Sequence, residues 1–185
     1  MPHQNILDPS QTALVVVDMQ EAFRTAIGDF SLIASRISTA VRGFLALDLP
    51  VLVTEQYPQG LGRTAEEIML MLPHETEFFE KTQFSSCGAT PFVDRLESGG
   101  VKQLVLCGIE AHICVNQTAH DLMDRGYQVH ILTDCVASRF EYDRDAGLRK
   151  MFASGAVSSS VEMVFFELMS DSKHAKFKEI QELIK

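Results

Sequence analysis

The chain has 185 residues, a formal net charge of −9 at pH 7, and 46% hydrophobic against 22% charged residues. This length and balance are typical of one globular domain with a sizeable core, which we expect to span residues 1–185. Nucleic-acid phosphates are bound by clustered Lys and Arg, so a chain this acidic is not expected to have a nucleic-acid partner.

The chain carries no pattern that points to a membrane or to secretion. Its apolar stretches are shorter than about ten residues, too short to span a bilayer, and the N-terminal MPHQNILDPSQ has no charged-then-apolar signal pattern. We therefore expect a cytoplasmic protein without membrane contact. The four cysteines, Cys87, Cys107, Cys114 and Cys135, form no CxxC pair. Their spacing favours reduced thiols over a zinc knuckle, a thioredoxin motif or a disulfide framework.

The first half of the chain alternates strand and helix patterns. TALVVVD, at 12–18, is a continuous apolar run, as expected of a strand buried on both faces. Residues 31–48 carry apolar side chains at helical spacing and precede a second buried strand, PVLVTE, at 50–55. A loop-like tract at 54–64 and a short helix separate this strand from a third one, expected at 75–82.

The second half continues the alternation. The expected elements are a helix at 90–98, a strand at 101–108, a helix at 113–125, a strand at 127–134, a helix at 144–154, a strand at 156–160 and an amphipathic helix at 174–185. Strands that alternate with helices predict an α/β fold. We expect a doubly wound, mainly parallel, six-stranded sheet with helices on both faces, a Rossmann-like three-layer sandwich.

In doubly wound folds the functional site lies outside the carboxyl ends of the strands. Asp18 ends the first strand, where a carboxylate faces this crevice, although an acid there can also cap a helix or form an ion pair. A phosphate-accepting aspartate wants a second Asp two residues on, and Gln20 stands there. A magnesium-binding receiver wants an acidic pair, and Val17 precedes Asp18. Both chemistries are disfavoured. By the same rule Asp134, after the fifth strand, is a crevice candidate.

Two cysteines seven residues apart, Cys107 and Cys114, differ in context. Cys107 lies within LVLC of the fourth strand, where burial raises a thiol pKa and lowers reactivity, so we expect a core residue. Cys114 stands in the first turn of the next helix, whose free N–H groups and macrodipole favour an anion. This position predicts a lowered thiol pKa and a nucleophile. A core cysteine on an ordinary helix is the alternative.

Lys81 and the histidines are weaker candidates. Lys81, in FFEKTQFSS, is by itself most simply a surface lysine, and it gains interest because Asp18 and Cys114 are expected in the same crevice. A metal site needs two or three converging ligands, and the loop after the second strand offers only Glu55, so we expect no metal and no cofactor. The histidines are interpreted as surface or packing residues, with His112 as a pocket wall.

Together these positions resemble the isochorismatase-like cysteine hydrolase superfamily, which includes nicotinamidases and N-carbamoylsarcosine amidase. The family pattern is an Asp ending the first strand, a Lys after the third and a Cys opening the helix after the fourth. Here these are Asp18 in VVVDMQEAF, Lys81 in FEKTQFS and Cys114 in CGIEAHICV. The tract DCVASR at 134–139 is also similar. TEQYPQGLG, CGIEAHICV and KFKEIQELIK resemble the isochorismatase domain-containing subgroup, and the resemblance covers essentially the whole chain.

The resemblance implies a Cys–Asp–Lys triad. Asp18 would take the thiol proton and return it to the leaving group, Lys81 would stabilise the thiolate, and Cys114 would attack a carbonyl to give a thioester that water hydrolyses. A cis peptide bond at Ile109–Glu110 is also implied, and it would aim the Glu110 N–H, with that of Cys114, at the oxyanion. We expect five side chains to line the substrate pocket: Gln20, Tyr57, Gln59, Phe84 and His112.

Two departures from the family pattern bear on the substrate. Nicotinamidases bind a metal through Asp-x-His after the second strand, where this chain has Glu55-Gln56-Tyr57. Isochorismatases cleave a vinyl ether by proton transfer and do not need the cysteine. With Cys114 present, we expect a metal-independent hydrolase of a small amide or related C–N bond. A vinyl-ether hydrolase with Asp18 as proton donor, and a catalytically faded binding or scaffold protein, remain alternatives.

Two further expectations follow from the resemblance. A Glu110 carboxylate that faces the pocket would disfavour an anionic substrate. The superfamily usually forms dimers or larger oligomers, so a homo-oligomer, a dimer or a tetramer, is expected. The terminal helix and the Met-rich EEIMLMLP at 66–73 are candidates for its interface, although core packing explains single methionines equally well.

Overall fold

The structure is a computed structural model that describes residue 3 and residues 5–185. Residues 1, 2 and 4, in the N-terminal segment that shows no signal pattern, lie outside the described residues. Six parallel strands form one sheet in the order β3-β2-β1-β4-β5-β6. The strands are β1 (Thr12–Val17), β2 (Val51–Gln56), β3 (Phe78–Lys81), β4 (Gln103–Ile109), β5 (Gln128–Ala137) and β6 (Val157–Ser159).

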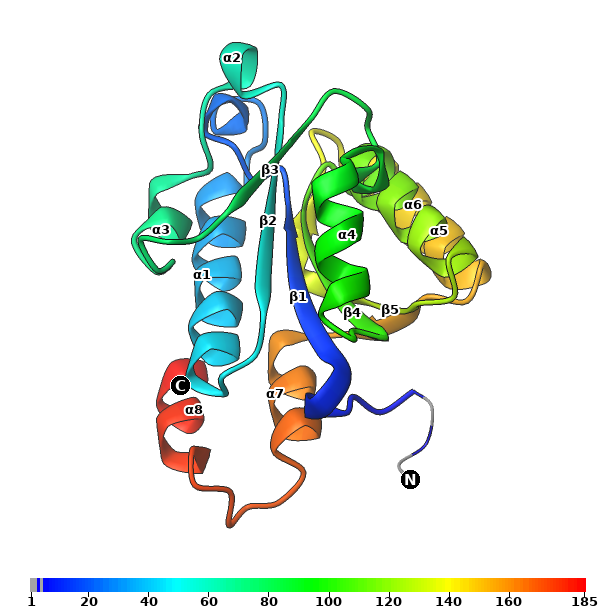
Figure 1. Ribbon diagram of the computed structural model, residues 1–185. Helices are drawn as coiled ribbons and strands as arrows, with labels where there is room; N and C mark the ends of the chain where they lie inside the picture. Colours follow the sequence, from blue (N-terminus) through cyan, green and yellow to red (C-terminus); the bar gives the residue numbers. More distant parts are fainter. Residues whose placement is uncertain (1–2, 4) are drawn as a thin grey trace.

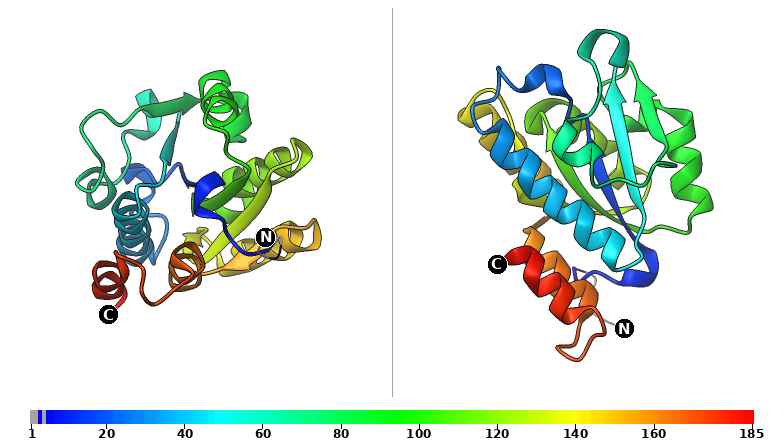
Figure 2. Two further views of the ribbon diagram at one scale, coloured as in Figure 1. Left: turned by 60° about the horizontal axis from the view of Figure 1, so that its bottom comes forward. Right: turned by 90° about the vertical axis from the view of Figure 1, so that its left-hand side faces the viewer.

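Helices cover both faces of this sheet (Figure 1). They are α1 (Phe30–Ala46), α2 (Pro58–Leu61), α3 (Glu66–Met69), α4 (Thr90–Ser98), α5 (Asn116–Asp124), α6 (Glu141–Ala153), α7 (Val161–Met169) and α8 (Phe177–Ile184). Figure 2 shows α1, α7 and α8 on one face and α4, α5 and α6 on the other. The predicted three-layer α/β fold is therefore confirmed. Within the part of the chain that the structure covers, no helix has the length and apolar character needed to cross a bilayer.

Strand β1 is buried along its whole length because helices cover both of its sides. Leu14 and Val16 belong to the apolar core under α1, whereas Val15 and Val17 belong to the core under α4 and α5. Successive strand side chains point to opposite faces, so a strand with two covered faces needs an unbroken apolar run. This is the physical basis of the strand predicted from TALVVVD.

Helix α7 was not predicted, although its sequence carries the signals of a helix. Val161, Val164, Phe165 and Leu168 are buried at helical spacing, and Ser160 caps the helix by accepting a hydrogen bond from the Met163 N–H. Only Ser160 separates this helix from β6, so the sequence shows no loop to mark where the strand ends and a new helix begins. Strand β5 also runs three residues past its predicted end at 134.

The carboxyl ends of β1 and β4 meet at the point where the strand order reverses. Gly108 of β4 lies beside Val17 of β1 with φ +119°, and a Cβ at Gly108 would lie 2.0 Å from the Val17 carbonyl oxygen. Only glycine permits this approach. Asp18 follows with φ +49°, in the left-handed region that Asp tolerates better than most residues. The two chain segments that leave these strands are thereby brought together.

Candidate active site

Asp18 and Lys81 form a buried ion pair at the carboxyl ends of β1 and β3. Nζ of Lys81 lies 2.5 Å from Oδ2 of Asp18, and the two side chains are 1% exposed or less. The ammonium also donates to Gln56 Oε1 at 2.6 Å and to the backbone carbonyls of Gln83 at 3.2 Å and Phe84 at 2.9 Å. A lysine is tolerated in the interior when its charge is paired and its donors are used. The surface-lysine interpretation of Lys81 is therefore wrong.

Strand β2 holds Asp18 at two points. The Thr54 hydroxyl donates to Asp18 Oδ1 at 2.7 Å, and the Thr54 carbonyl accepts a hydrogen bond from the Asp18 N–H at 3.2 Å. With Lys81 on Oδ2, both carboxylate oxygens have a fixed donor. The plane of the carboxylate is therefore set by donors from β2 and from β3.

Cys114 lies beside this pair, in a π-helical turn, Ala111–Val115, that leads into α5. Its thiol lies close enough to Asp18 and to Lys81 for both groups to act on its pKa. Burial and, after it, the Asp18 carboxylate raise the pKa of the Cys114 thiol to about 12, while Lys81 acts in the opposite direction. The predicted lowering of this pKa by the helix start is wrong, because burial and the neighbouring Asp18 carboxylate raise the pKa of the thiol. The resting group is a thiol beside a proton acceptor.

The other cysteines are free thiols away from this pair. Cys107 is 0% exposed and its thiol donates to the Val15 carbonyl at 3.5 Å. Burial raises the pKa of Cys107, so its predicted role as a core residue is confirmed. Cys135 is also buried, and Cys87 is half-buried after β3. Of the four, Cys114 is the one that lies beside the buried Asp18–Lys81 pair.

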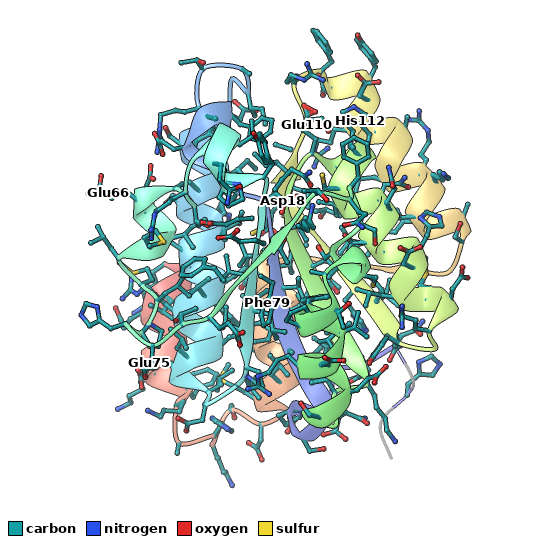
Figure 3. All side chains as sticks on the ribbon, turned by 45° about the horizontal axis from the view of Figure 1, so that its top comes forward. Asp18, Glu66, Glu75, Phe79, Glu110 and His112 are labelled. Atoms are coloured by element: carbon teal, nitrogen blue, oxygen red, sulfur yellow. The ribbon has the colours of Figure 1, made fainter. Side chains whose placement is uncertain are left out.

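The segment between β4 and α5 contains a cis peptide bond at Ile109–Glu110. The Glu110 side chain is buried and accepts hydrogen bonds from Arg139 Nε at 2.8 Å and from the Arg139 backbone N–H at 3.2 Å. Glu110 and His112 lie at the same end of the molecule as Asp18 (Figure 3). The charge of Glu110 is thus paired with the segment that follows β5.

His112 links the segment between β4 and α5 to the start of α6. Its Nδ1 lies 2.9 Å from the Ser138 hydroxyl, and its Nε2 lies 3.9 Å from Asp143 Oδ2. Helix α6 approaches closely because residue 147 is glycine: a Cβ on Gly147 would lie 2.8 Å from the His112 Cα. His112 is half-buried, and its ring is held by hydrogen bonding to the segment after β5.

Gln20, expected in the pocket wall, is buried and committed to the protein. Its amide donates to the carbonyls of Gln56 at 3.0 Å and Gly62 at 2.7 Å and accepts from the Gln56 N–H at 2.8 Å. The side chain therefore braces the loop that follows β2. It does not present a free amide to the crevice.

Three other pocket candidates are exposed: Tyr57 and Gln59 lie on this loop, and Phe84 follows β3. Tyr57 and Phe84 are both 54% exposed, and exposed Gln59 donates to Glu80 at 3.2 Å. A surface hollow of about 360 Å³ is lined by Tyr57 and Gln59 together with Lys81. Phe84 is not among its lining residues, although its backbone carbonyl binds Lys81.

The residues at the nicotinamidase metal position do not fit a metal site. Oε1 of buried Glu55 accepts hydrogen bonds from the Thr64 N–H at 2.7 Å and from the Thr64 hydroxyl at 2.8 Å. This carboxylate holds the loop before α3. Among residue 3 and residues 5–185, no group of three or more His, Cys, Asp or Glu is arranged to hold a metal ion.

Asp134, the crevice candidate after the fifth strand, lies inside β5. It pairs with Arg36 at 2.9 Å and accepts from the Val161 N–H at the start of α7. Its role is therefore to hold α1 and α7 together. Conversely, Thr54 and Arg139 bind the site carboxylates and were not predicted. In the sequence Thr54 is one more strand residue, and Arg139 stands out only as the end of DCVASR.

Comparisons with known proteins show the family of the chain. A family model described as isochorismatase domain matches residues 12–163. Isochorismatase domain-containing protein 1 of Salmo salar is 40% identical over 179 residues, 97% of this chain, which spans only 62% of that relative. Isochorismatase domain-containing protein 2 of Homo sapiens is 41% identical over 181 residues, 96% of this chain and 84% of that protein. A solved structure, MAR1 ribonuclease from Caenorhabditis elegans, matches with a TM-score of 0.92 and 40% identity, over 97% of this chain and 92% of that chain. The chain belongs to the isochorismatase family.

Proposed function

We propose that the protein is a metal-independent cysteine hydrolase that cleaves a small amide or related C–N bond through a thioester intermediate. The observation that carries this proposal is the position of the Cys114 thiol beside the buried Asp18–Lys81 pair, where both charged groups act on it. A nucleophile within hydrogen-bonding reach of a base, with the base oriented by a third group, is the arrangement that covalent catalysis requires. Lys81 supplies that third group.

In the proposed reaction, Cys114 attacks the substrate carbonyl while its proton moves to Asp18. Because the pKa of the thiol is about 12, little thiolate exists near neutral pH, and proton transfer accompanies attack. Lys81 holds the carboxylate and offsets the negative charge that develops on sulfur. The tetrahedral intermediate collapses as Asp18 returns the proton to the leaving amine. Asp18 then deprotonates a water that hydrolyses the thioester, and the thiol is restored.

The backbone N–H groups of Glu110 and Cys114 are proposed to bind the oxyanion of the tetrahedral intermediate. Glu110 follows the cis peptide bond and opens the turn that contains Cys114. Such donors contribute about 3–4 kcal/mol to the stability of an acyl-transfer transition state. Because Arg139 pairs the Glu110 carboxylate, that charge does not oppose the oxyanion.

The hollow beside Lys81 is the proposed entry for substrate, at a size usual for small-molecule sites. Tyr57 and Gln59 are proposed to contact the substrate there. Phe84, with an exposed ring, and His112, in the turn that carries Cys114, are proposed to border it. Gln20 is proposed to act indirectly, by bracing the loop that carries Tyr57.

The name of the Caenorhabditis elegans structure raises RNA as a second substrate class. The net charge of −9 disfavours binding of a phosphate backbone. The cation beside Asp18, Lys81, already donates to Asp18, Gln56 and two carbonyls. We therefore propose a small-molecule substrate and no nucleic-acid partner. The homo-oligomer, a dimer or tetramer, and the cytoplasmic location stay predictions.

Trapping of the acyl intermediate tests the proposal. Wild type, Cys114→Ala and the matched Cys87→Ala are incubated with p-nitrophenyl acetate and with a panel of small primary amides, and intact masses are recorded. We expect an acyl adduct on wild type and Cys87→Ala and none on Cys114→Ala. Full turnover of a vinyl ether by Cys114→Ala would instead favour proton-transfer chemistry at Asp18. A folded wild type that forms no adduct with any probe would favour a binding or scaffold protein.

A further inference from the structure

Three buried hydroxyl groups connect the Asp18 carboxylate to the helix that follows Cys114. The Thr54 hydroxyl donates to Asp18 Oδ1 at 2.7 Å. The Ser86 hydroxyl donates to Thr54 Oγ1 at 3.5 Å, and the Thr118 hydroxyl donates to Ser86 Oγ at 3.1 Å. Thr54, Ser86 and Thr118 are each 0% exposed, so no bulk water competes for these bonds.

The hydroxyl protons of this chain all point the same way. The Ser86 backbone N–H donates to Thr118 Oγ1 at 2.9 Å, which directs the Thr118 proton toward Ser86. From there each hydroxyl donates to the next, and the last donates to a carboxylate, which only accepts. Hydrogen bonds in series polarise one another when water is excluded. A change at Thr118 is therefore felt at Asp18 through Ser86 and Thr54.

The chain of hydroxyl groups also joins the elements that carry the proposed catalytic residues. Thr54 lies on β2, next to the strand that ends at Asp18. Ser86 lies in the turn after β3, five residues beyond Lys81, and Thr118 lies on α5, four residues and about one helical turn beyond Cys114. Movement of α5 relative to the sheet would stretch this chain.

We propose that Thr54, Ser86 and Thr118 are positioning residues whose donated protons offset part of the Asp18 carboxylate charge at the Cys114 thiol and couple the carboxylate to the nucleophile helix. This inference rests on the proposed role of Asp18 as the base. Thr54 acts most strongly because it contacts the carboxylate directly. The Ser86–Thr54 contact, at 3.5 Å, is long for a bond between hydroxyls, so Ser86 and Thr118 contribute less.

Loss of the hydroxyl chain is expected to change the reactivity of the Cys114 thiol in one direction. Cys114 faces two charged groups, Asp18 and Lys81, and the Asp18 charge raises the pKa of the thiol. The Thr54 proton offsets part of the carboxylate charge. Without this proton more of the charge acts on Cys114, and the thiolate forms less readily. A purely structural role of Thr54 would leave this reactivity unchanged.

The test measures alkylation of Cys114 by iodoacetamide in the full chain, from about pH 7 to about pH 9, with peptide-resolved mass spectrometry. Well below the thiol pKa, the thiolate fraction falls about tenfold when that pKa rises by one, and the alkylation rate falls with it. At a given pH we expect Thr54→Val to slow alkylation about tenfold, and Ser86→Ala and Thr118→Val about threefold each. Thr54→Ser, which keeps the donor, is expected to stay within about twofold of wild type.

Thr12→Val is the matched control, because it also removes a buried threonine hydroxyl from a strand of the same sheet, away from the site. Thr12 lies at the opposite end of β1 and donates to the Asp8 carbonyl at 2.7 Å. It is expected to alkylate at the wild-type rate. The inference is overturned if Thr54→Val alkylates like Thr12→Val or faster. Circular dichroism checks folding, and if Thr54→Val does not fold, the Ser86 and Thr118 variants decide by the same criterion.

Burst acylation by p-nitrophenyl acetate, run on the same variants, separates the two proposals. A wild type that is alkylated at Cys114 but never acylated removes the hydrolase proposal, and the alkylation series still decides the hydroxyl chain. If acylation is normal and the variants do not differ, the hydrolase proposal stands and the proposed role of the hydroxyl chain is overturned. A burst slowed in parallel with alkylation supports both.

Discussion

Lys81 donates a 2.5 Å hydrogen bond to Asp18, and neither side chain is more than 1% exposed. Removing two charges from water is costly, and their attraction offsets this only with good geometry and additional hydrogen bonds. Here Thr54 supplies one such bond to Asp18, and Gln56 accepts one from Lys81. Each charge therefore depends on the other for its place in the interior.

Loss of one partner should destabilise the protein more than loss of both. We expect Lys81→Met and Asp18→Asn each to lower the free energy of unfolding, by about 3–5 kcal/mol for Lys81→Met, which leaves a carboxylate buried and unpaired. The double variant is expected to lose clearly less than the sum of the two. Urea unfolding of the four proteins measures these values. Strict additivity would show that the ion pair is not coupled.

Asp18→Asn should separate thiol reactivity from catalysis. The Asp18 carboxylate raises the pKa of Cys114, so its neutral replacement is expected to speed alkylation of Cys114 by about tenfold or more at neutral pH. Turnover of any acyl substrate is expected to fall, because the base is gone. Asp124→Asn, on the exposed side of α5, is the control. Slower alkylation of Asp18→Asn would contradict this assignment of the carboxylate.

The convergence of Asp18, Lys81 and Cys114 was predictable because the carboxyl ends of parallel strands meet at one edge of the sheet. The raised pKa of the Cys114 thiol was not predictable. A helix start is visible in sequence, whereas burial and the approach of Asp18 depend on the packing of α5 against the sheet. The Thr54–Ser86–Thr118 chain was hidden for the same reason, since each contact joins residues 32 positions apart.

Gly108→Ala tests the close approach of β4 to β1. A Cβ at this position would lie 2.0 Å from the Val17 carbonyl, and φ +119° is a conformation that alanine avoids. We expect a loss on the order of 3 kcal/mol in the free energy of unfolding, or failure to fold. Gly28→Ala is the control, because its Cβ would meet nothing within 4 Å. Equal stability of both variants would exclude the steric account of Gly108.

His130 of β5 should make stability depend on pH. It is 0% exposed, and its Nε2 has no hydrogen-bond partner within the described residues. Burial lowers the pKa of His130 to about 4, whereas an unfolded histidine titrates near about 6.5. Between about pH 4 and pH 6.5, His130 binds a proton in the unfolded chain but stays neutral in the native state. The contribution of His130 is therefore complete above about pH 6.5 and is lost as the pH falls toward 4, by up to about 3 kcal/mol.

The free energy of unfolding in urea, measured from about pH 8 to about pH 4, tests this window. His130→Leu removes the titrating group while it keeps an apolar side chain in the core, so we expect its stability to fall less steeply between about pH 6.5 and pH 4. His74→Leu, at an exposed site, controls for the loss of a histidine and should keep the wild-type slope. An identical slope in His130→Leu and wild type would mean that the acid sensitivity of the fold arises from groups other than His130.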